Sequence, residues 1–478
     1  MKSRRDWILL ILIVALFLWA NLFLIYRWGI YSLEYIPVIL LFVLVLFTRL
    51  DIVFYSIALL VPLSIPLHFL KPGIEYDLSI PAEPIIVSLM MVFLAKCLTE
   101  GSYDSRLLRH RVSVAIYFYL LWMLITSFTS THFLVSFKYF LARFWFITVF
   151  YFFGLVIFKK IKNIQRYEWL YIASLLLVIA YTFARHIPAG LTNQQASNWA
   201  CQPLYNDHTD YGAALAMVLP FAIAGLFINK KTDILIRIVQ FFIVVLLLVA
   251  IVFSYTRATW LSLAGAAGIW IIMKLHIRFW KIALLAIAGG ILFYSFQTEI
   301  LYALQRNRSG SSGDFMQHLQ SMTNISTDES NLERINRWDC ALKMFEDKPW
   351  FGWGPGTYQF EYGAYQSANK ITSISTFAGD LGNAHSEYLG PLAEQGIFGT
   401  VAFLLVLITS MYTGIHVYNK AGRRKVRILA MAFVVALSTY YLHGILNNFL
   451  DTDKLSALFW TNIAMLVSFD VYKKKKDE

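Results

Sequence analysis

Four basic side chains in the second half of the chain have the types and neighbours that phosphate chemistry requires. His385 stands in NAHSEYLG and Arg257 in FSYTRATW, each at the edge of an apolar stretch. Arg334 and Arg337 lie three residues apart in ERINRW, so on a helix they share a face. Guanidinium groups bind phosphate oxygens in a bidentate way, and a histidine can take a proton from an attacking hydroxyl near neutral pH. These residues therefore predict displacement of a phosphate or diphosphate, with the arginines stabilising the departing charge.

Each of these residues also has an ordinary structural interpretation. A histidine at a helix start can be an interfacial residue, with Glu387 favourable to the helix dipole. Arg257 could extend to the lipid headgroups, and Arg334 with Arg337 could form a solvated charged face. Their occurrence together, without an Asp/Glu/His cluster of metal-site type, favours catalysis that needs neither a metal nor a cofactor.

The sequence around these residues is that of a polytopic membrane protein. Of 478 residues, 58% are hydrophobic, 17% aromatic and only 15% charged. Apolar runs long enough to cross a bilayer recur from end to end, so we predict an all-α polytopic membrane protein with about 12–14 transmembrane helices. The N-terminal run is too long for a signal-peptide core, and we interpret it as a retained span. The predicted spans are 7–26, 34–48, 52–70, 80–97, 112–130, 134–158, 168–184, 211–228, 235–254, 258–273, 280–297, 387–415, 427–445 and 455–472.

Basic clusters indicate the orientation of these spans. FKKIKNIQR, KLHIRFWK, NKAGRRKVR and the tail YKKKKDE all fall on one side. The positive-inside rule makes this side cytoplasmic and places both termini there. The net charge of +12 then reflects membrane topology rather than nucleic-acid binding. Cys97, Cys201 and Cys340 show no metal or disulfide spacing, although Cys201 and Cys340 share the outer side and leave a pairing open.

Two long polar segments land on the outer side. One is 185–210, and the other, 298–386, is expected to be a folded periplasmic subdomain rather than a linker. The remaining domain boundaries are a transmembrane bundle at 1–297 and C-terminal helices with a basic tail at 387–478. Within the second segment we predict an amphipathic helix at 331–345, with an apolar stripe made of Ile335, Trp338, Ala341, Leu342 and Phe345.

The stretch WFGWGPGTYQFEYGAY combines close-spaced glycines with aromatic residues. Glycines permit tight turns, and aromatic rings offer flat surfaces for sugars or lipid edges. Together with polar residues near the outer ends of the spans, they complete the candidate substrate-binding set: Arg337, Glu387, Tyr255, Trp338, Trp353, Tyr388 and His208.

Three stretches, in this order, resemble motifs of the O-antigen ligase and polymerase superfamily of bacterial envelope glycosyltransferases. YTRATWLSLAGA resembles its Ser-Arg motif at a span start, with Thr256 in place of the common serine. RINRWDCALKMFEDKPWFGWGPGTY resembles its Arg-x-x-x-Trp segment, and NAHSEYLGPLAEQGIFGT its His motif, with Ser386 in place of the common asparagine. The resemblance covers roughly residues 200–450. YNDHTDYGAALAMVLP resembles the family's outer loop only loosely, which leaves the roles of His208 and Asp210 open.

The resemblance implies a GT-C-like fold and roles for individual residues. His385 would be the catalytic base, Arg257 and Arg334 would clamp the diphosphate, and Glu387 would orient His385. Arg337 has no counterpart in the motif and is a substrate-binding candidate. The reaction implied is transfer of O-antigen glycan from undecaprenyl diphosphate to lipid A-core at the periplasmic face of the inner membrane, metal-independent and with inversion.

Other functions remain open from the sequence. A polysaccharide polymerase or a protein O-oligosaccharyltransferase would use the same chemistry, and no residue separates them from a ligase. A transporter of a lipid-linked substrate would place charges near the midplane, as Lys138 and Arg143 in the sixth predicted span do. The absence of an internal repeat and the gathering of charges at the outer rim favour a transferase.

Overall fold

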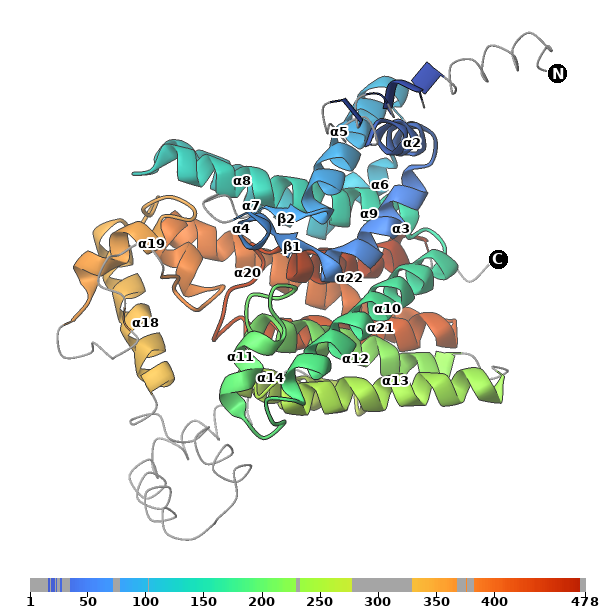
Figure 1. Cartoon of the computed structure of the whole chain (residues 1–478). Coiled ribbons are helices and arrows are strands. Elements are labelled where there is room, and N and C mark those ends of the chain that lie inside the picture. The colour runs from blue at the N-terminus through green and yellow to red at the C-terminus, as the bar shows by residue number, and fades with distance from the viewer. Residues whose placement is uncertain are drawn as a thin grey trace, which may run out of the picture.

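The computed structural model describes residues 35–71, 78–101, 103–228, 233–276, 329–367, 375 and 382–472, with isolated residues between 16 and 27. Helices dominate this part of the chain, and most of the long ones run side by side (Figure 1). A two-residue antiparallel ladder of β1 (Ile65–Pro66) and β2 (Ser79–Ile80) is the one sheet among the described residues. The predicted all-α polytopic class is confirmed.

Nine helical segments in the described ranges are long and apolar enough to cross a membrane. One of them, Phe133–Ile157, consists of α8 (Phe133–Phe146), a π-helical turn η3 (Ile147–Phe153) and α9 (Gly154–Ile157). The other eight are α5 (Ala82–Glu100), α7 (Arg111–Phe128), α10 (Ile161–His186), α12 (His208–Ile228), α13 (Ile234–Phe253), α20 (Leu389–Lys420), α21 (Arg424–His443) and α22 (Asp453–Tyr472).

Shorter helices connect or cover these segments. Those of the first two hundred residues are α2 (Tyr35–Thr48), α3 (Leu50–Leu60), η2 (Val61–Leu63), α4 (Leu67–Leu70), α6 (Ser105–Leu108) and α11 (Gln194–Ala200). Those that follow are α14 (Arg257–Lys274), α18 (Glu329–Asp347), α19 (Tyr358–Glu361) and η4 (Tyr362–Tyr365).

The predicted spans 34–48 and 52–70 form a single bent pair. The first corresponds to α2, while α3 and η2 cover only the start of the second, and the chain bends by 118° between them. Arg49 interrupts the helix at the bend and pairs with Asp51 at 3.1 Å. The pair is one broken span or a re-entrant hairpin, so two full crossings were not a correct prediction here. The predicted span 280–297, and most of 7–26, lie outside the described residues.

The helices are buried to very different extents. Every residue of α22 from Asp453 to Asp470 is buried, so this helix forms the centre of the bundle. On α13 only Val244, Leu247, Ala250 and Ile251 are buried, so this helix lies at the periphery. The predicted span 258–273 corresponds to α14, which is less apolar than the nine and packs along α21, where its small residues permit close approach.

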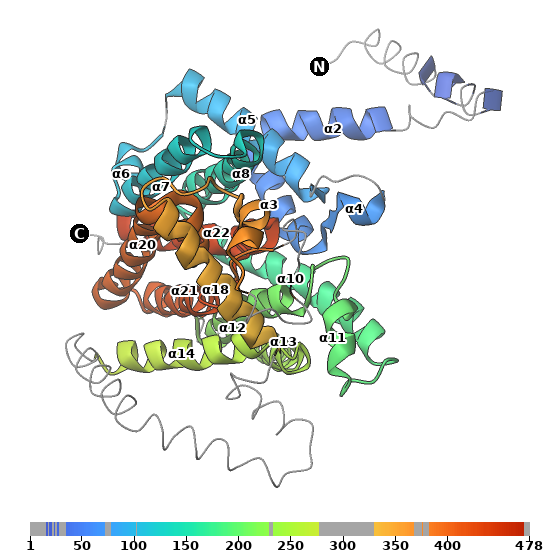
Figure 2. The ribbon, with the colours of Figure 1, turned by 90° about the vertical axis from the view of Figure 1, so that its left-hand side faces the viewer.

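The segment 329–367 packs against the start of α20, across the end of the bundle that Figure 2 faces. Its own small core contains Cys340, Met344, Tyr358 and Tyr362, together with Ala393 from α20. Neither Cys340 nor Cys201 is disulfide-bonded. We call 329–367 the loop subdomain.

Helix α18 confirms the helix predicted at 331–345, but only part of its apolar stripe faces inward. Ala341 is buried and Trp338 and Phe345 are partly buried, while Ile335 and Leu342 are 36% and 46% exposed. Asn336, Arg337 and Cys340 are buried as well. The helix turns a charged face inward because that face is satisfied by an internal ion pair.

Candidate functional site

The sequence-predicted site residues come together at one end of the bundle. The starts of α12, α14 and α20, the end of α21 and the loop subdomain all lie there, on the left of Figure 1. The Arg334 Nε donates to the carbonyl of Leu446, just past the end of α21, at 3.3 Å. The Thr256 hydroxyl donates to the carbonyl of His208 at 2.7 Å, which joins the start of α14 to the start of α12. Arg257 is the next residue after this link.

His385 occupies a tight turn just before α20. Its φ of 46° lies in the left-handed region, which non-glycine residues adopt rarely and mostly at functional or turn positions. Its backbone N–H donates to Asn383 Oδ1 at 3.0 Å, and the Arg337 guanidinium donates to the carbonyl of Asn383 at 3.1 Å. Arg337 therefore holds the turn that presents the histidine.

Arg337 is itself fixed by the loop subdomain. Its Nε lies 2.7 Å from Glu333 Oε1, one helical turn earlier, and both side chains are buried. The Ser375 hydroxyl donates to the second oxygen of Glu333, and the guanidinium lies 5.3 Å from the centre of the Tyr362 ring. The Tyr358 hydroxyl donates to the Arg337 carbonyl at 2.7 Å. A buried charge with this many partners keeps one orientation.

The surroundings of His385 favour its neutral form. Burial lowers the pKa of His385 to about 3, and the positive charges of Arg337 and Arg334 add to this effect. The carboxylates of Glu333 and Asp207 act in the opposite direction but more weakly. At neutral pH the ring is therefore unprotonated and can accept a proton. Among the residues that the structure describes, none forms a hydrogen bond with the His385 ring.

Glu387 holds the connection between α21 and α22. One of its carboxylate oxygens accepts hydrogen bonds from the Tyr440 hydroxyl at 2.5 Å and from the Phe449 and Leu450 N–H groups at 2.9 Å each. Its own N–H donates to the Gly444 carbonyl at 2.8 Å. Glu387 thereby fixes the backbone two residues after His385, so any orienting effect on the histidine passes through the main chain.

The aromatic candidates have structural partners as well. Trp353 donates its indole N–H to Met344 at 3.0 Å, and Lys348 lies 3.7 Å above its ring. The Tyr388 hydroxyl donates to the Tyr441 carbonyl at 2.8 Å. The Tyr255 hydroxyl donates to the Leu191 carbonyl at 2.9 Å, from a residue whose φ is 51°. Of the four, Trp338 keeps an indole N–H with no partner in the described ranges, available to a ligand.

The structure adds polar residues that sequence reasoning missed. Asn336 on α18 is fully buried, and neither end of its amide has a hydrogen-bond partner among the described residues. His443 ends α21 with 1% exposure; its Nε2 lies 3.1 Å from Asn447 Nδ2, and its Nδ1 has no partner in the same part of the chain. A histidine that ends an apolar run and precedes the pair of asparagines in LHGILNN was the available signal.

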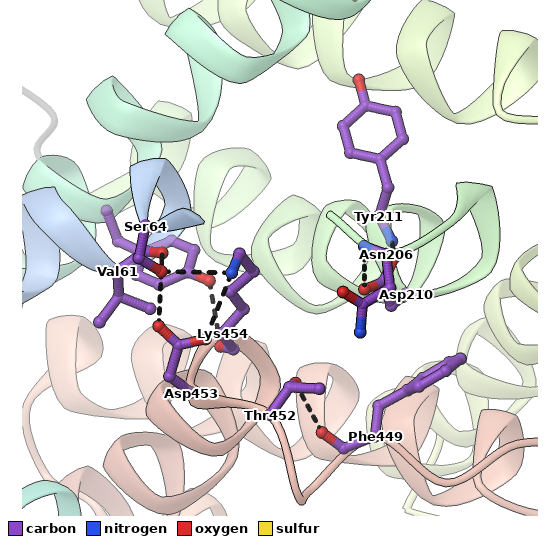
Figure 3. A network of polar contacts seen from close by, with 10 residues as sticks. Val61, Ser64, Asn206, Asp210, Tyr211, Phe449, Thr452, Asp453 and Lys454 are labelled. Carbon is purple, nitrogen blue, oxygen red and sulfur yellow. Dashed lines mark hydrogen bonds and ion pairs between the residues drawn. The ribbon is translucent and has the colours of Figure 1, made fainter. Parts of the chain in front are cut away.

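A second set of buried charges lies next to this site, and Figure 3 shows part of it. Lys454 Nζ lies 3.2 Å from Ser64 Oγ and 3.3 Å from Asp453, and Ser64 donates to the other Asp453 oxygen at 2.6 Å. Arg143 donates to the Leu450 carbonyl and, at 2.6 Å, to the Tyr139 hydroxyl. We call Glu387, Arg143, Asp453 and Lys454 the anchoring cluster, because they hold residues 444–454 in place.

Asp210, whose role the sequence left open, is also engaged internally. Its carboxylate accepts hydrogen bonds from the N–H groups of Asn206 at 3.0 Å, Asp207 at 3.3 Å and Tyr211 at 2.7 Å (Figure 3). These bonds shape the turn before α12 and place Asp207, whose charge reaches His385. Asp210 thus acts on the site through the backbone.

One family model matches part of the chain. Residues 242–404 are similar to the family model described as O-Antigen ligase. The matched segment contains Arg257, Arg334, Arg337, His385 and Glu387. The match supports a membrane glycosyltransferase-related activity in the handling of O-antigen or other polysaccharides.

A curated relative extends the comparison without adding a function. An uncharacterized protein of Haemophilus influenzae (strain ATCC 51907 / DSM 11121 / KW20 / Rd) is 23% identical over 175 residues, which cover 36% of this chain. The chain spans 42% of the length of that relative. The substrates and partners of this protein therefore have to be argued from the site.

Proposed function

We propose that this protein is an O-antigen ligase that transfers a glycan from undecaprenyl diphosphate to a hydroxyl of lipid A-core. The observation that supports this best is the position of His385: an unprotonated ring, in a turn held by Arg337, within the field of two arginines. A neutral base beside phosphate-binding cations fits attack by a hydroxyl on a diphosphate-activated sugar.

In the proposed step the acceptor oxygen attacks the anomeric carbon while the bond from that carbon to the diphosphate oxygen breaks. The electron pair leaves with undecaprenyl diphosphate, and His385 takes the acceptor proton. Arg257 and Arg334 bind the diphosphate and stabilise the charge that develops on it. Attack opposite the leaving group inverts the anomeric configuration. The step requires neither a metal ion nor another cofactor.

The charges around His385 link donor binding to its basicity. The guanidinium groups of Arg334 and Arg337 lower the pKa of His385. A bound diphosphate would neutralise part of that positive field and raise the pKa of His385 toward the ordinary value near 6.5. The histidine would then become a better base only when the donor is in place.

We further propose that the site faces the periplasm of the inner membrane and that both termini are cytoplasmic. This orientation puts the basic connections, including the one between α20 and α21, on the cytoplasmic side. In the corresponding domain division, the loop subdomain belongs to a periplasmic unit at 298–386, between a helical bundle at 1–297 and the C-terminal helices at 387–478. The polyprenyl tail of the donor can then remain in the bilayer beside α20.

The test is a reconstituted assay with purified protein, an undecaprenyl-diphosphate glycan and lipid A-core as acceptor. Wild type is compared with His385→Asn, because asparagine tolerates the left-handed backbone of this turn. We expect glycan on lipid A-core with wild type, and a 10²- to 10⁴-fold lower rate with the variant, as expected for loss of a general base. Equal thermal unfolding of the two proteins is the control for folding.

Other products would replace the proposal. Lengthening of glycan on the carrier would make the protein a polymerase, and glycan on an added protein acceptor would make it a protein O-oligosaccharyltransferase. Movement of intact donor across the bilayer, unaffected by the substitution at His385, would establish the transporter. Loss of transfer on chelation of divalent cations would contradict the metal-independent step.

A further inference from the structure

A crevice opens at the end of the bundle opposite the candidate site. It lies where α12 ends and where α13 and α21 begin, at the right-hand ends of these helices in Figure 1. Its volume of about 590 Å³ is within the range of small-molecule sites, roughly 300–1,000 Å³. The crevice is therefore large enough for a lipid headgroup with the first part of its acyl chains.

The walls of the crevice are apolar and accessible. Phe227 from α12 and Ile234 and Phe241 from α13 line it, and they are 56%, 68% and 55% exposed. Helix α13 is the peripheral helix of the bundle, so this surface faces the bilayer rather than another part of the described chain. Acyl chains are the expected neighbours of such a surface.

Two arginines from different helices share the same crevice. Arg237 lies one turn into α13, and Arg424 is the first residue of α21. Guanidinium groups at the edge of hydrocarbon are matched best by phosphate oxygens, which they bind in a bidentate way.

We propose that this crevice is a binding site for an anionic phospholipid of the cytoplasmic leaflet, with its phosphodiester between Arg237 and Arg424. The acyl chains lie along Phe227 and Phe241, parallel to α13. The lipid bridges the start of α13 to the start of α21. Clusters of basic residues on the cytoplasmic side of membrane proteins bind anionic lipids in this manner.

The inference depends on the proposed orientation of the chain but not on glycan transfer. Its test measures lipid retention by the full-length protein in phosphatidylcholine nanodiscs into which phosphatidylglycerol is titrated, with no glycan donor present. A protein that binds phosphatidylglycerol but transfers no glycan would keep this inference and lose the proposed function. A protein that transfers glycan but shows no preference for phosphatidylglycerol would keep the proposed function and lose this inference.

The variants are the double substitution Arg237→Ala with Arg424→Ala and, as a matched control, Arg427→Ala. Arg427 is exposed on the same helix as Arg424 but does not line the crevice. Each arginine near an anionic headgroup contributes about fivefold in affinity, so the double variant should bind phosphatidylglycerol roughly 25-fold more weakly. The control should stay within about twofold of wild type.

Three results would overturn the assignment. The double variant could bind phosphatidylglycerol as well as wild type does, or the control could lose as much affinity as the double variant. Undecaprenyl phosphate, titrated in place of phosphatidylglycerol, could be the lipid that wild type retains. The charge reversal Arg424→Glu provides a second test, because it should abolish the preference for phosphatidylglycerol over phosphatidylcholine.

Discussion

The site residues around His385 and the anchoring cluster are neighbours with very different bonding. In the anchoring cluster the polar groups bond to protein: Glu387 accepts three hydrogen bonds, and Arg143 and Lys454 reach a carbonyl, hydroxyls and a carboxylate. Around His385 some polar groups lack such bonds. Arg337 is fully engaged, but the His385 ring and the Asn336 amide have no protein partner among the described residues.

This difference in bonding distinguishes residues that support the site from residues that can contact a substrate. A buried charged group whose hydrogen bonds are all made to the protein fixes the backbone and has no donor or acceptor available for a ligand. A buried polar group that leaves its bonds unmade costs free energy, which a bound substrate can recover. By this criterion we propose that His385 and Asn336 face the substrate, whereas Arg337 and the anchoring cluster hold the surrounding backbone.

The largest effect should come from Arg337. Arg337→Gln leaves Glu333 buried without its cation, which we expect to destabilise the protein by about 3–5 kcal/mol and to abolish transfer. The double variant with Glu333→Gln removes both charges and should recover most of the thermal stability without recovering transfer. Thermal unfolding in detergent and the transfer assay measure the two separately; a double variant as unstable as the single one would contradict the support role.

A substitution at Arg257 tests the proposed role of the site residues in catalysis. Arg257→Lys keeps the charge but loses the planar fork that binds two phosphate oxygens. We expect transfer to fall about 10²- to 10³-fold, as for other lost transition-state donors, with unchanged unfolding temperature. Full activity of the lysine variant would rule out a bidentate clamp at this position.

A substitution at Glu387 tests the structural role of the anchoring cluster. Glu387→Gln exchanges a charged acceptor of three hydrogen bonds for a neutral one, which should cost about 1.5–3 kcal/mol of stability. The folded fraction should keep most of its rate of transfer. If instead kcat falls as far as with Arg257→Lys at an unchanged unfolding temperature, Glu387 belongs to the chemistry and the comparison breaks.

The smallest effect concerns pH. Because the pKa of His385 is lowered to about 3, the base is already unprotonated at pH 5, and kcat/KM should stay nearly constant from pH 8 to pH 5. Arg334→Gln removes a positive charge that lowers this pKa, so the pKa should rise and the loss of activity should begin at higher pH. A wild-type profile that already falls below pH 6.5 would show an unperturbed histidine.

The sequence was sufficient for the long apolar helices and for the residues of the family motifs. The ends of the spans were less accurate, because apolar windows omit polar helix ends; α20 runs to Lys420, beyond the predicted limit at 415. The bend between α2 and α3 was not visible, since hydropathy measures the length of an apolar run and not its direction. Only the interruption at Arg49 marks it.

The inward face of α18 and the role of His443 could not be obtained from the sequence. Amphipathic patterning assumes that charges face water, but Arg337 faces inward because Glu333 compensates it one turn away. LHGILNN singles out His443 as a histidine at the end of an apolar run, but its place near the site follows only from the structure, where Arg334 of α18 donates to the Leu446 carbonyl. Arg143 was noticed as a charge within a span, but its internal partners became visible only in three dimensions.

The join between the loop subdomain and α20 limits which part of the chain can be exchanged between related proteins. Gly352 and Gly396 both have positive φ, and a side chain at either would collide with the other segment's backbone, at Glu394 and Trp350 respectively. Between them the N–H of Gly354 donates to Glu394 at 2.7 Å, and that of Ile397 to Pro349 at 2.9 Å. A grafted loop from another species would therefore function only if it is transplanted together with the first turns of α20, so the module that evolution or an engineer can swap extends past residue 396.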